Sequence, residues 1–433
     1  FFPPNFHTAS GEGWVVSRRP RRPSPHELMN LLRVRQRGQP VEQLAQNKQE
    51  GKTATSVRLL LLRLSRTYDS MSNVLGLRDL QDYIQGNTSL PLSESPLWLL
   101  GTPYIVAQKP GGGESGHGKL EAIEEAMVEF LADFRSRIWI TYRKEFPPIG
   151  STSLTSDVGW GCTLRSGQMM LAEALMRYYV GRGWRKCSEP QQQQQHSVED
   201  VVRYFWDQPD LECRFSIHNI CKFGADTGIV PGEWLGPYVV CKTLEAAVNS
   251  FDSLQLSVHV ICEPGGGAPT LYTSSAAAPS RPWPRLMLVP LTLGVEKMNP
   301  VYHEQLKSVL RLPQSVGIVG GRPGSSLYFI GTQDDQLLYL DPHFTRAAPT
   351  STEDLPTFHC DVVRHLHISQ MDPSLAIGFL CPNEEEFWEL SDALAALEAS
   401  AGTAALITVR DTEPKQPSGD GDSWADESCA SPA

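Results

Sequence analysis

The sequence predicts an α/β or α+β body in which a mixed sheet packs against one helix that begins at Cys162. Three observations support this fold class. Apolar residues recur at helical spacing in several segments, and short apolar runs bounded by Gly and Pro alternate with those segments. The chain also shows no internal repeat, which is expected for layers of helices and strands around one core.

Length and composition bound the class of protein. A chain of 433 residues is long enough for one large domain or two smaller ones. No apolar run approaches the roughly 20 residues of a membrane span, and the N-terminus lacks a secretory signal pattern. The chain begins without Met, so we expect a fragment or a processed product. The nine cysteines are odd in number and form no CxxC pair, which predicts free thiols and a cytoplasmic protein without a structural metal or cofactor.

Charge predicts where the ordered body lies. Residues 1–66 hold twelve Lys and Arg against four Asp and Glu, whereas residues 411–433 hold one Lys against six. We therefore predict a largely disordered basic extension over 1–118 and an acidic disordered tail over 411–433. The apolar run Val57–Leu64 predicts a short helix, either lying on a membrane or partner or folding against the body. Neither terminus has the aromatic interleaving of a nucleic-acid module, so no nucleic-acid partner is expected.

The predicted domain, residues 119–410, contains helices, strands and two insertions. Helices are predicted over 121–134, from Cys162 onward, 201–206, 237–251, 302–310 and 384–397. Strands are predicted over 258–262, 285–293, 316–321, 326–330 and 337–340, and 138–142 is expected to be a strand or a buried turn. Two polar insertions are expected at about 186–200 and 264–284. The glycine-rich run 320–325 lacks the ending of a phosphate loop and predicts a tight connection between strands.

Cys162 is the first candidate for chemistry. It ends a polar, glycine-broken loop, and a helical pattern begins at the same place. The dipole and free N–H groups of a helix N-terminus favour a thiolate, and such sites lower a cysteine pKa from roughly 8.5 to about 3.5–7.5. The sequence therefore predicts a nucleophile. A buried structural cysteine at the start of a core helix fits the local pattern equally well.

A second candidate site is the run Leu337–His343, a short apolar strand that ends in Asp-Pro-His. Residues i and i+2 of a strand point to the same face, so Asp341 and His343 come from one edge. An aspartate beside a histidine orients the imidazole for general-base work. The pattern alone is also typical of a surface pair, but together with Cys162 it suggests a Cys–His–Asp set.

These motifs, with five others in the same order, resemble those of the autophagins, the cysteine proteases of autophagy. The residues within some of the motifs are closer to plant-like members of the family. The matching segments are Trp139–Pro147, the Cys162 segment, Phe215–Asn219, Gly232–Pro237, Pro313–Gly321, Tyr339–His343 and Met371–Ser374. The resemblance implies a papain-like α+β fold with a small auxiliary subdomain, in which a mixed or antiparallel sheet packs on the helix of the catalytic cysteine.

The resemblance also implies residue roles. Cys162 matches the nucleophile, His343 the general base and acid, and Asp341 the residue that orients the histidine. Tyr142 matches the tyrosine that supports the oxyanion hole, and its O–H can donate to developing negative charge. Trp234 and Pro323 match the pair that covers the active-site entrance, which makes the turn around Pro323 a movable gate.

The implied activity is hydrolysis of one kind of bond in two substrates. One is the precursor of a GABARAP-type ubiquitin-like modifier, cut after its C-terminal glycine, and the other is that modifier joined to phosphatidylethanolamine. Contact with autophagic membranes is then peripheral, through the lipidated substrate. A general papain-like peptidase or deubiquitinase and an inactive modifier-binding protein are the two alternatives. Family docking motifs have the form aromatic-x-x-aliphatic, which Phe387–Leu390 also has, although its spacing equally fits a buried helix face.

Overall fold

The computed structural model describes Ser93 and residues 95–105, 116–186, 197–251, 253–263, 267–277 and 282–412, without the side chains of 116–124. The chain divides after Tyr83 into two units, and every described residue belongs to the second, Ile84–Ala433. The helix predicted at Val57–Leu64 and the predicted acidic tail beyond residue 412 lie outside the described residues. Among the helices that are described, none is long and apolar enough to cross a membrane.

A nine-stranded mixed sheet forms the centre of the second unit. Its strands are β1 (Leu97–Leu99), β2 (Thr102–Tyr104), β4 (Ser257–Val260), β6 (Arg285–Thr292), β7 (Ser315–Arg322), β8 (Ser325–Gln333), β9 (Gln336–Leu340), β11 (Arg364–His367) and β12 (Ser374–Cys381). The order is β11-β9-β8-β7-β12-β6-β4, with β1 pairing β8 and β2. The edge strand β4 runs parallel to β6, whereas β12 runs antiparallel to both β6 and β7. The mixed sheet predicted from the sequence is therefore confirmed.

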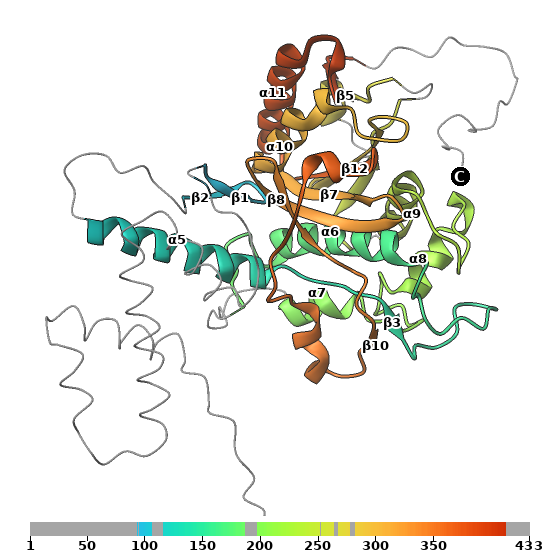
Figure 1. The fold of residues 1–433 in the computed structure, drawn as a ribbon. Helices are drawn as coiled ribbons and strands as arrows, with labels where there is room; N and C mark the ends of the chain where they lie inside the picture. Colours follow the sequence, from blue (N-terminus) through green and yellow to red (C-terminus); the bar gives the residue numbers. More distant parts are fainter. Residues whose placement is uncertain are drawn as a thin grey trace, which may run out of the picture. The chain divides into compact units, whose positions relative to one another are not determined.

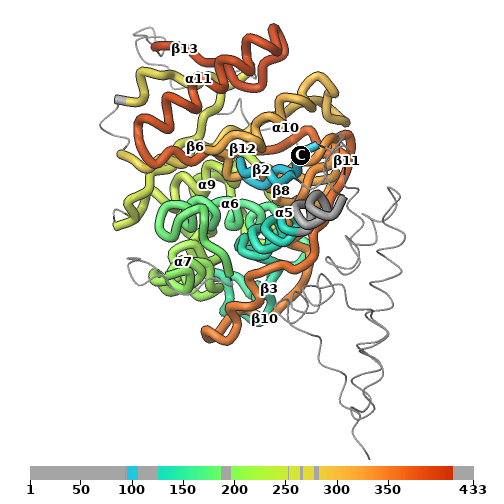
Figure 2. Tube along the Cα trace, turned by 90° about the vertical axis from the view of Figure 1, so that its left-hand side faces the viewer, coloured from blue at the N-terminus to red at the C-terminus, as the bar shows by residue number. Residues whose placement is uncertain are grey.

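Helices cover both faces of this sheet (Figures 1 and 2). The described helices are α5 (Gly116–Ser136), α6 (Cys162–Tyr179), α7 (Val198–Arg203), α8 (Ile217–Phe223), α9 (Pro237–Asn249), α10 (His303–Arg311) and α11 (Glu384–Ala401). Figure 1 shows α10 and α11 on one side of the sheet and α6 and α9 on the other, with α6 running beneath β7 and β8. The helix that begins at Cys162 therefore packs on the sheet, as the sequence predicts.

The core has two parts because alternate strand residues point to opposite faces. In β8, Tyr328 and Ile330 belong to the cluster on the α6 side. Their neighbours Leu327 and Phe329 belong to the cluster on the α10 and α11 side. All four side chains are at most 1% exposed. The apolar middle of β8, residues 327–330, is thus buried on both faces.

Gly378 of β12 lets α6 approach the sheet closely. A Cβ atom at this position would lie 2.6 Å from Sδ of Met170 in α6 and 2.7 Å from a methyl group of Val316. Real Cβ atoms do not approach neighbours this closely, so a side chain here would push helix and sheet apart. The absence of a side chain at Gly378 therefore allows the short distance between α6 and the sheet.

Two pairs of short strands lie outside the main sheet. The first joins β3 (Arg143–Lys144) to β10 (Arg346–Ala347) in parallel, and the second joins β5 (Thr270–Tyr272) to β13 (Thr408–Arg410). The pairing of β3 with β10 brings the segment before Cys162 against the segment after His343. This contact determines the geometry of the candidate site.

The structure differs from the sequence expectations in several elements. Strands β1 and β2 precede residue 119, where the ordered domain was expected to begin, and β5 lies inside the insertion expected at 264–284. Residues 138–142, expected to be a strand or a buried turn, form a buried segment without regular strand structure, so only the strand alternative is wrong. The expectations for 1–118 and 264–284 followed composition, whereas these short strands are held by partners distant in sequence, β8 and β13. The division into domains as a whole stays a prediction.

The motif Phe387–Leu390 lies in α11, where Phe387 and Leu390 are fully buried in the core. Both residues that a docking partner would have to reach are therefore inside the protein. The interpretation as a docking motif is wrong, and the buried helix face is confirmed.

Candidate functional site

Three segments that are far apart in the sequence meet at one end of α6. Cys162 is the first residue of this helix, and Asp341 and His343 directly follow β9. Tyr142 lies between them, because its N–H donates to the Pro342 carbonyl at 2.8 Å and its carbonyl accepts the N–H of Arg346 at 3.0 Å. The three residues expected to form the Cys–His–Asp set and the expected oxyanion tyrosine are thus brought together.

His343 is held by Asp341 through two hydrogen bonds. Oδ1 of Asp341 lies 2.7 Å from Nδ1 of His343 and accepts the backbone N–H of His343 at 3.0 Å. A carboxylate only accepts, so Nδ1 carries the hydrogen and Nε2 faces Cys162. The indole N–H of Trp139 donates to the Asp341 carbonyl at 2.7 Å, which fixes the loop that carries both residues.

The Cys162 thiol is 2% exposed. Burial opposes its ionisation, but hydrogen bonds from the His343 ring, the Ser326 backbone and the Tyr142 hydroxyl favour the thiolate. Together they lower the pKa of Cys162 from 9.0 to about 7. This side chain is therefore substantially ionised near neutral pH, unlike Cys221 or Cys241, whose thiol pKa values burial raises.

The pKa of His343 shifts upward, which favours the protonated ring beside the thiolate. Hydrogen bonds to Asp341 and to Cys162 outweigh partial burial and raise the pKa of His343 from 6.5 to about 9. Burial raises the pKa of Asp341, but its bonds to His343 outweigh this and leave it below the ordinary value. Between pH 7 and 9 the site therefore holds a thiolate beside an imidazolium.

Tyr142 and the start of α6 supply hydrogen-bond donors beside the thiolate. The Tyr142 ring packs edge-on against the His343 ring with centroids 5.4 Å apart, and its hydroxyl bonds to Cys162. Burial and the adjacent thiolate raise the pKa of Tyr142, so the phenol stays protonated and can donate. Gly161, the N-cap of α6, offers no side-chain cap, so it leaves the first backbone N–H groups of the helix without a side-chain acceptor from the cap residue.

A buried ion-pair network anchors the loop before Cys162. Asp157 accepts the backbone N–H of Arg143 at 2.6 Å and Nε of Arg165 at 2.8 Å, and Arg165 also donates to Asp207 at 2.8 Å. The side chains of all three members, Asp157, Arg165 and Asp207, are at most 1% exposed. A Cβ atom at position 161 would overlap the Asp157 carboxylate, so glycine is required there. The network ties the Tyr142 segment to the helix of the nucleophile.

The expected gate residues lie on two exposed loops. Trp234 precedes α9 and is 53% exposed. Pro323 occupies the exposed two-residue turn between β7 and β8, followed by Gly324 at a φ of +74°. Proline and a left-handed glycine are the residues that such a turn requires. The tight connection is confirmed, whereas the role of the pair as a gate stays a prediction.

Two serines that sequence reasoning missed connect this turn to the reacting groups. Oγ of Ser325 lies 3.4 Å from Nε2 of His343, and the backbone of Ser326 bonds to the Cys162 thiol. Ser326 also donates to Ser166 of α6 at 3.2 Å. Their position directly after Pro323-Gly324 is the signal that could have found them, because β8 starts at this turn.

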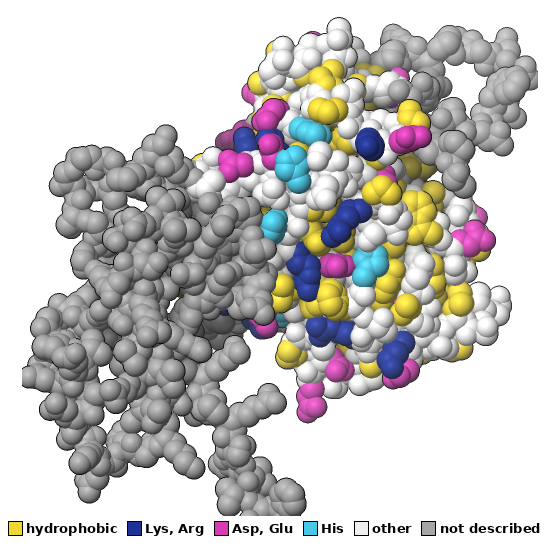
Figure 3. Space-filling model, viewed as in Figure 1, with side chains coloured by type: hydrophobic (Ala, Val, Ile, Leu, Met, Phe, Trp, Pro, Cys, Tyr) yellow, Lys and Arg dark blue, Asp and Glu magenta, His cyan; other side chains and the backbone are white. Residues whose placement is uncertain are grey.

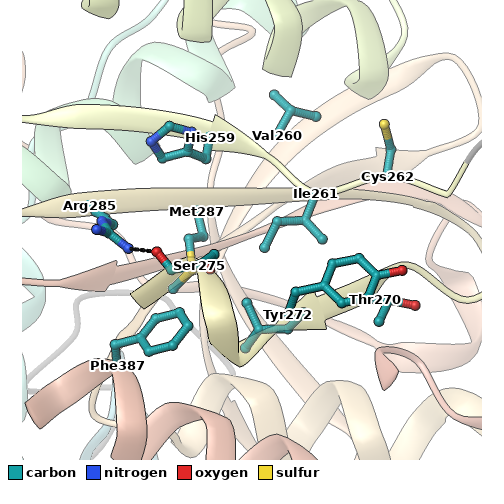
Figure 4. A pocket seen from close by; sticks show the side chains of 11 residues that line it. His259, Val260, Ile261, Cys262, Thr270, Tyr272, Ser275, Arg285, Met287 and Phe387 are labelled. Carbon is teal, nitrogen blue, oxygen red and sulfur yellow. Dashed lines mark hydrogen bonds between the residues drawn. The ribbon is translucent and has the colours of Figure 1, made fainter. Parts of the chain in front are cut away.

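A cavity of about 130 Å³ lies between β4, β6, β5 and α11, where His259, Tyr272 and Phe387 are among the lining residues (Figure 4). It contains none of the residues expected to carry the chemistry. Figure 4 shows the guanidinium of Arg285 turned toward Ser275, whose carbonyl accepts at 2.8 Å. Within the described ranges, no group of three or more His, Cys, Asp or Glu side chains is placed to hold a metal ion.

Comparisons with known proteins agree with this chemistry. A family model described as the peptidase C54 catalytic domain matches residues 127–393. The chain is 38% identical over 349 residues to "Cysteine protease ATG4B" of Oryza sativa subsp. indica, covering 74% of this chain and 71% of that protein. It is 36% identical over 363 residues to "Cysteine protease ATG4a" of Arabidopsis thaliana, covering 78% and 75%.

A fungal protein matches over a shorter stretch. The chain is 36% identical over 318 residues to "Probable cysteine protease atg4" of Aspergillus niger, covering 66% of this chain and 76% of that protein. The family match confirms the predicted papain-like α+β fold and the predicted cysteine peptidase. The chain therefore belongs to the peptidase C54 family, the Atg4 cysteine proteases of autophagy.

Proposed function

We propose that this protease cleaves the amide bond after the C-terminal glycine of a GABARAP-type ubiquitin-like modifier. The bond is cut in the precursor and in the conjugate with phosphatidylethanolamine. The observation that carries the proposal is the buried Cys162 thiol, whose pKa is lowered to about 7 beside a His343 that is held by Asp341. The resemblance to the autophagins and the match to peptidase C54 supply the substrate class.

The geometry supports a two-step acyl transfer. The Cys162 thiolate attacks the glycine carbonyl carbon, and the tetrahedral oxyanion accepts hydrogen bonds from the Tyr142 hydroxyl and a backbone N–H at the start of α6. His343, protonated at Nε2, gives its proton to the leaving amine as the carbon–nitrogen bond breaks. The neutral imidazole then takes a proton from water, which attacks the thioester and releases the carboxylate. Asp341 keeps Nδ1 protonated throughout.

A narrow entrance accounts for the glycine requirement. In this proposal the turn that contains Pro323 moves away from Trp234 when the modifier binds, and the extended C-terminus enters between them. Ser325 and Ser326 follow the turn and touch His343 and Cys162, so the gate is directly continuous with the reacting groups. A glycine passes because it has no side chain, whereas a larger residue would have to displace the entrance further.

The test uses a purified modifier precursor extended beyond its glycine. We expect the wild-type chain to release the extension, and Cys162→Ala and His343→Ala to release none while retaining modifier binding. Cys262→Ser is the matched control, because Cys262 is a partly exposed cysteine outside the site that forms no disulfide, and its replacement should leave the rate unchanged. Cleavage by a folded Cys162→Ala protein would contradict the proposal.

Other substrates separate the alternatives. Cleavage of a ubiquitin fusion with no cleavage of the modifier precursor would favour a general papain-like peptidase or deubiquitinase. Binding of the modifier without cleavage, together with failure of a thiol-reactive probe to label native Cys162, would favour an inactive binding protein. We also propose action in the cytoplasm, which the seven described cysteines support, because none of them forms a disulfide and a reducing compartment keeps thiols reduced.

A further inference from the structure

Three arginines surround the loop that carries Asp341 and His343, and each rests on an aromatic ring. Arg346 lies 4.8 Å from the centre of the Trp139 ring, and Arg364 lies 4.7 Å from that of Phe344. The third, Arg322, donates to the Tyr339 hydroxyl at 3.0 Å. Cation–π contacts of this kind hold a guanidinium in place without neutralising its charge.

None of these three cations forms a close ion pair with a described carboxylate, although the charge of Arg364 lowers the pKa of the nearby Asp341. Most other buried or half-buried arginines of this body pair with carboxylates, as Arg137 does with Glu173 and Arg165 with Asp157. By contrast, neither Arg322, Arg346 nor Arg364 forms an ion pair with a described carboxylate. The formal net charge of the chain is −11, so a cluster of three arginines without close ion pairs does not follow from overall composition.

Exposed apolar side chains lie among the same arginines. Phe344 is 41% exposed and Val362 is 39% exposed. The guanidinium of Arg364 stacks on Phe344 and lies 3.5 Å from the Val362 carbonyl, so cation and apolar groups form one continuous surface. Figure 3 views the face over β3 and β10, where Lys and Arg side chains gather beside histidine and hydrophobic side chains, with a few Asp or Glu side chains among them. We call Arg322, Arg346, Arg364, Phe344 and Val362 the arginine rim.

We propose that the arginine rim docks on the anionic headgroup surface of a lipid bilayer. Guanidiniums beside exposed apolar side chains match the layer where lipid phosphates meet the acyl chains. The inference rests on the proposed function, because a lipid-linked substrate brings its scissile amide to such a surface. The rim would orient the Cys162 entrance toward the bilayer and offset the repulsion between an acidic protein and an acidic membrane.

Local protection from hydrogen exchange tests this docking directly. The full chain carrying Cys162→Ala is mixed with vesicles of phosphatidylcholine, with or without phosphatidylserine. We expect phosphatidylserine vesicles to slow amide exchange in the segments around Phe344 and Val362, and added salt to remove the effect. Because the readout is local, binding through the basic residues 1–66 does not imitate it. A bound chain without protection in these segments, or no binding at all, would overturn the proposal.

Arginine variants give the matched comparison. Arg346→Gln combined with Arg364→Gln should abolish the local protection. Arg214→Gln should preserve it, because Arg214 also stacks on aromatic rings but lies near Tyr179, at the end of α6 opposite Cys162. Each arginine near an anionic surface contributes about a fivefold change in affinity, so the double variant should bind its vesicle-borne substrate about 25-fold more weakly through this surface.

Two substrates separate this proposal from the proposed function. The double variant should lose more kcat/KM on vesicle-borne conjugate than on soluble precursor, by about 25-fold at low salt. Equal losses on both substrates would overturn membrane docking and favour an acidic surface of the modifier itself as the partner. A wild-type chain that cleaves neither substrate would refute the proposed function, while the exchange measurement would still report on vesicle docking.

Discussion

Replacing Asp341 with Asn removes the charge that holds His343 as an imidazolium while preserving the shape of the side chain. Asp341 is the largest influence on the pKa of His343, which stands at about 9 against an ordinary 6.5. The reactive form needs a Cys162 thiolate and a protonated His343, and in the wild type these two states coexist between about pH 7 and pH 9. We therefore expect kcat/KM to rise through pH 7 and to fall through pH 9.

The size of the effect follows from these values. At pH 8 about 80% of wild-type molecules hold the thiolate–imidazolium pair, whereas a His343 pKa near 6.5 leaves about 3%. Asp341→Asn should thus lower kcat/KM at pH 8 by at most about 30-fold, because Cys162 still raises the pKa of His343 in the variant, and the alkaline limb of the profile should move from pH 9 toward pH 6.5.

The assay is cleavage of soluble precursor across this pH range, supported by the rate at which iodoacetamide alkylates Cys162. Asp392→Asn is the control, because Asp392 is an exposed residue of α11 on the opposite side of the sheet. An alkaline limb that stays near pH 9 in Asp341→Asn would refute the assignment of this carboxylate as the cause of the histidine shift.

Three further changes probe other parts of the account. Tyr142→Phe removes one oxyanion donor and should lower kcat by about 100-fold with little change in KM, and an unchanged kcat in steady-state cleavage would exclude this role. Ser325→Ala removes the hydroxyl 3.4 Å from Nε2 of His343 and should speed iodoacetamide alkylation of Cys162 about twofold at neutral pH, so a slower reaction would contradict competition for Nε2. Gly378→Ala should destabilise the protein by about 1–3 kcal/mol in urea unfolding, because its Cβ atom would overlap Met170, and an unchanged midpoint would show that α6 can move away.

The elements that sequence reasoning predicts best are those with long, regular patterns. The helix from Cys162 carries a clear helical period, and the strand before Asp341 is a continuous apolar run that ends at Asp-Pro-His, so the candidate nucleophile and base could be chosen. Turn chemistry was equally informative at Pro323-Gly324, because few residue pairs suit a two-residue connection.

What the sequence does not reveal depends on contacts between distant segments. Strand β1 has only three residues and exists because it pairs with β8, and β5 exists because it pairs with β13. Arg165 lies in a segment with a helical pattern, where an arginine is normally expected to face solvent. In the structure it is fully buried between Asp157 and Asp207. The contact of Ser325 with His343 likewise requires the sheet register, which no local pattern specifies.

The covalent bond between Cys162 and the modifier is the most direct test of the central claim. The full chain would be mixed with modifier whose C-terminal glycine is replaced by a propargylamide, and the adduct would be mapped by peptide mass spectrometry. The account predicts one adduct per chain at Cys162, formed fastest between pH 7 and 9 and lost in Cys162→Ala. An adduct on another cysteine, or no adduct on a folded chain that binds the modifier, would contradict it.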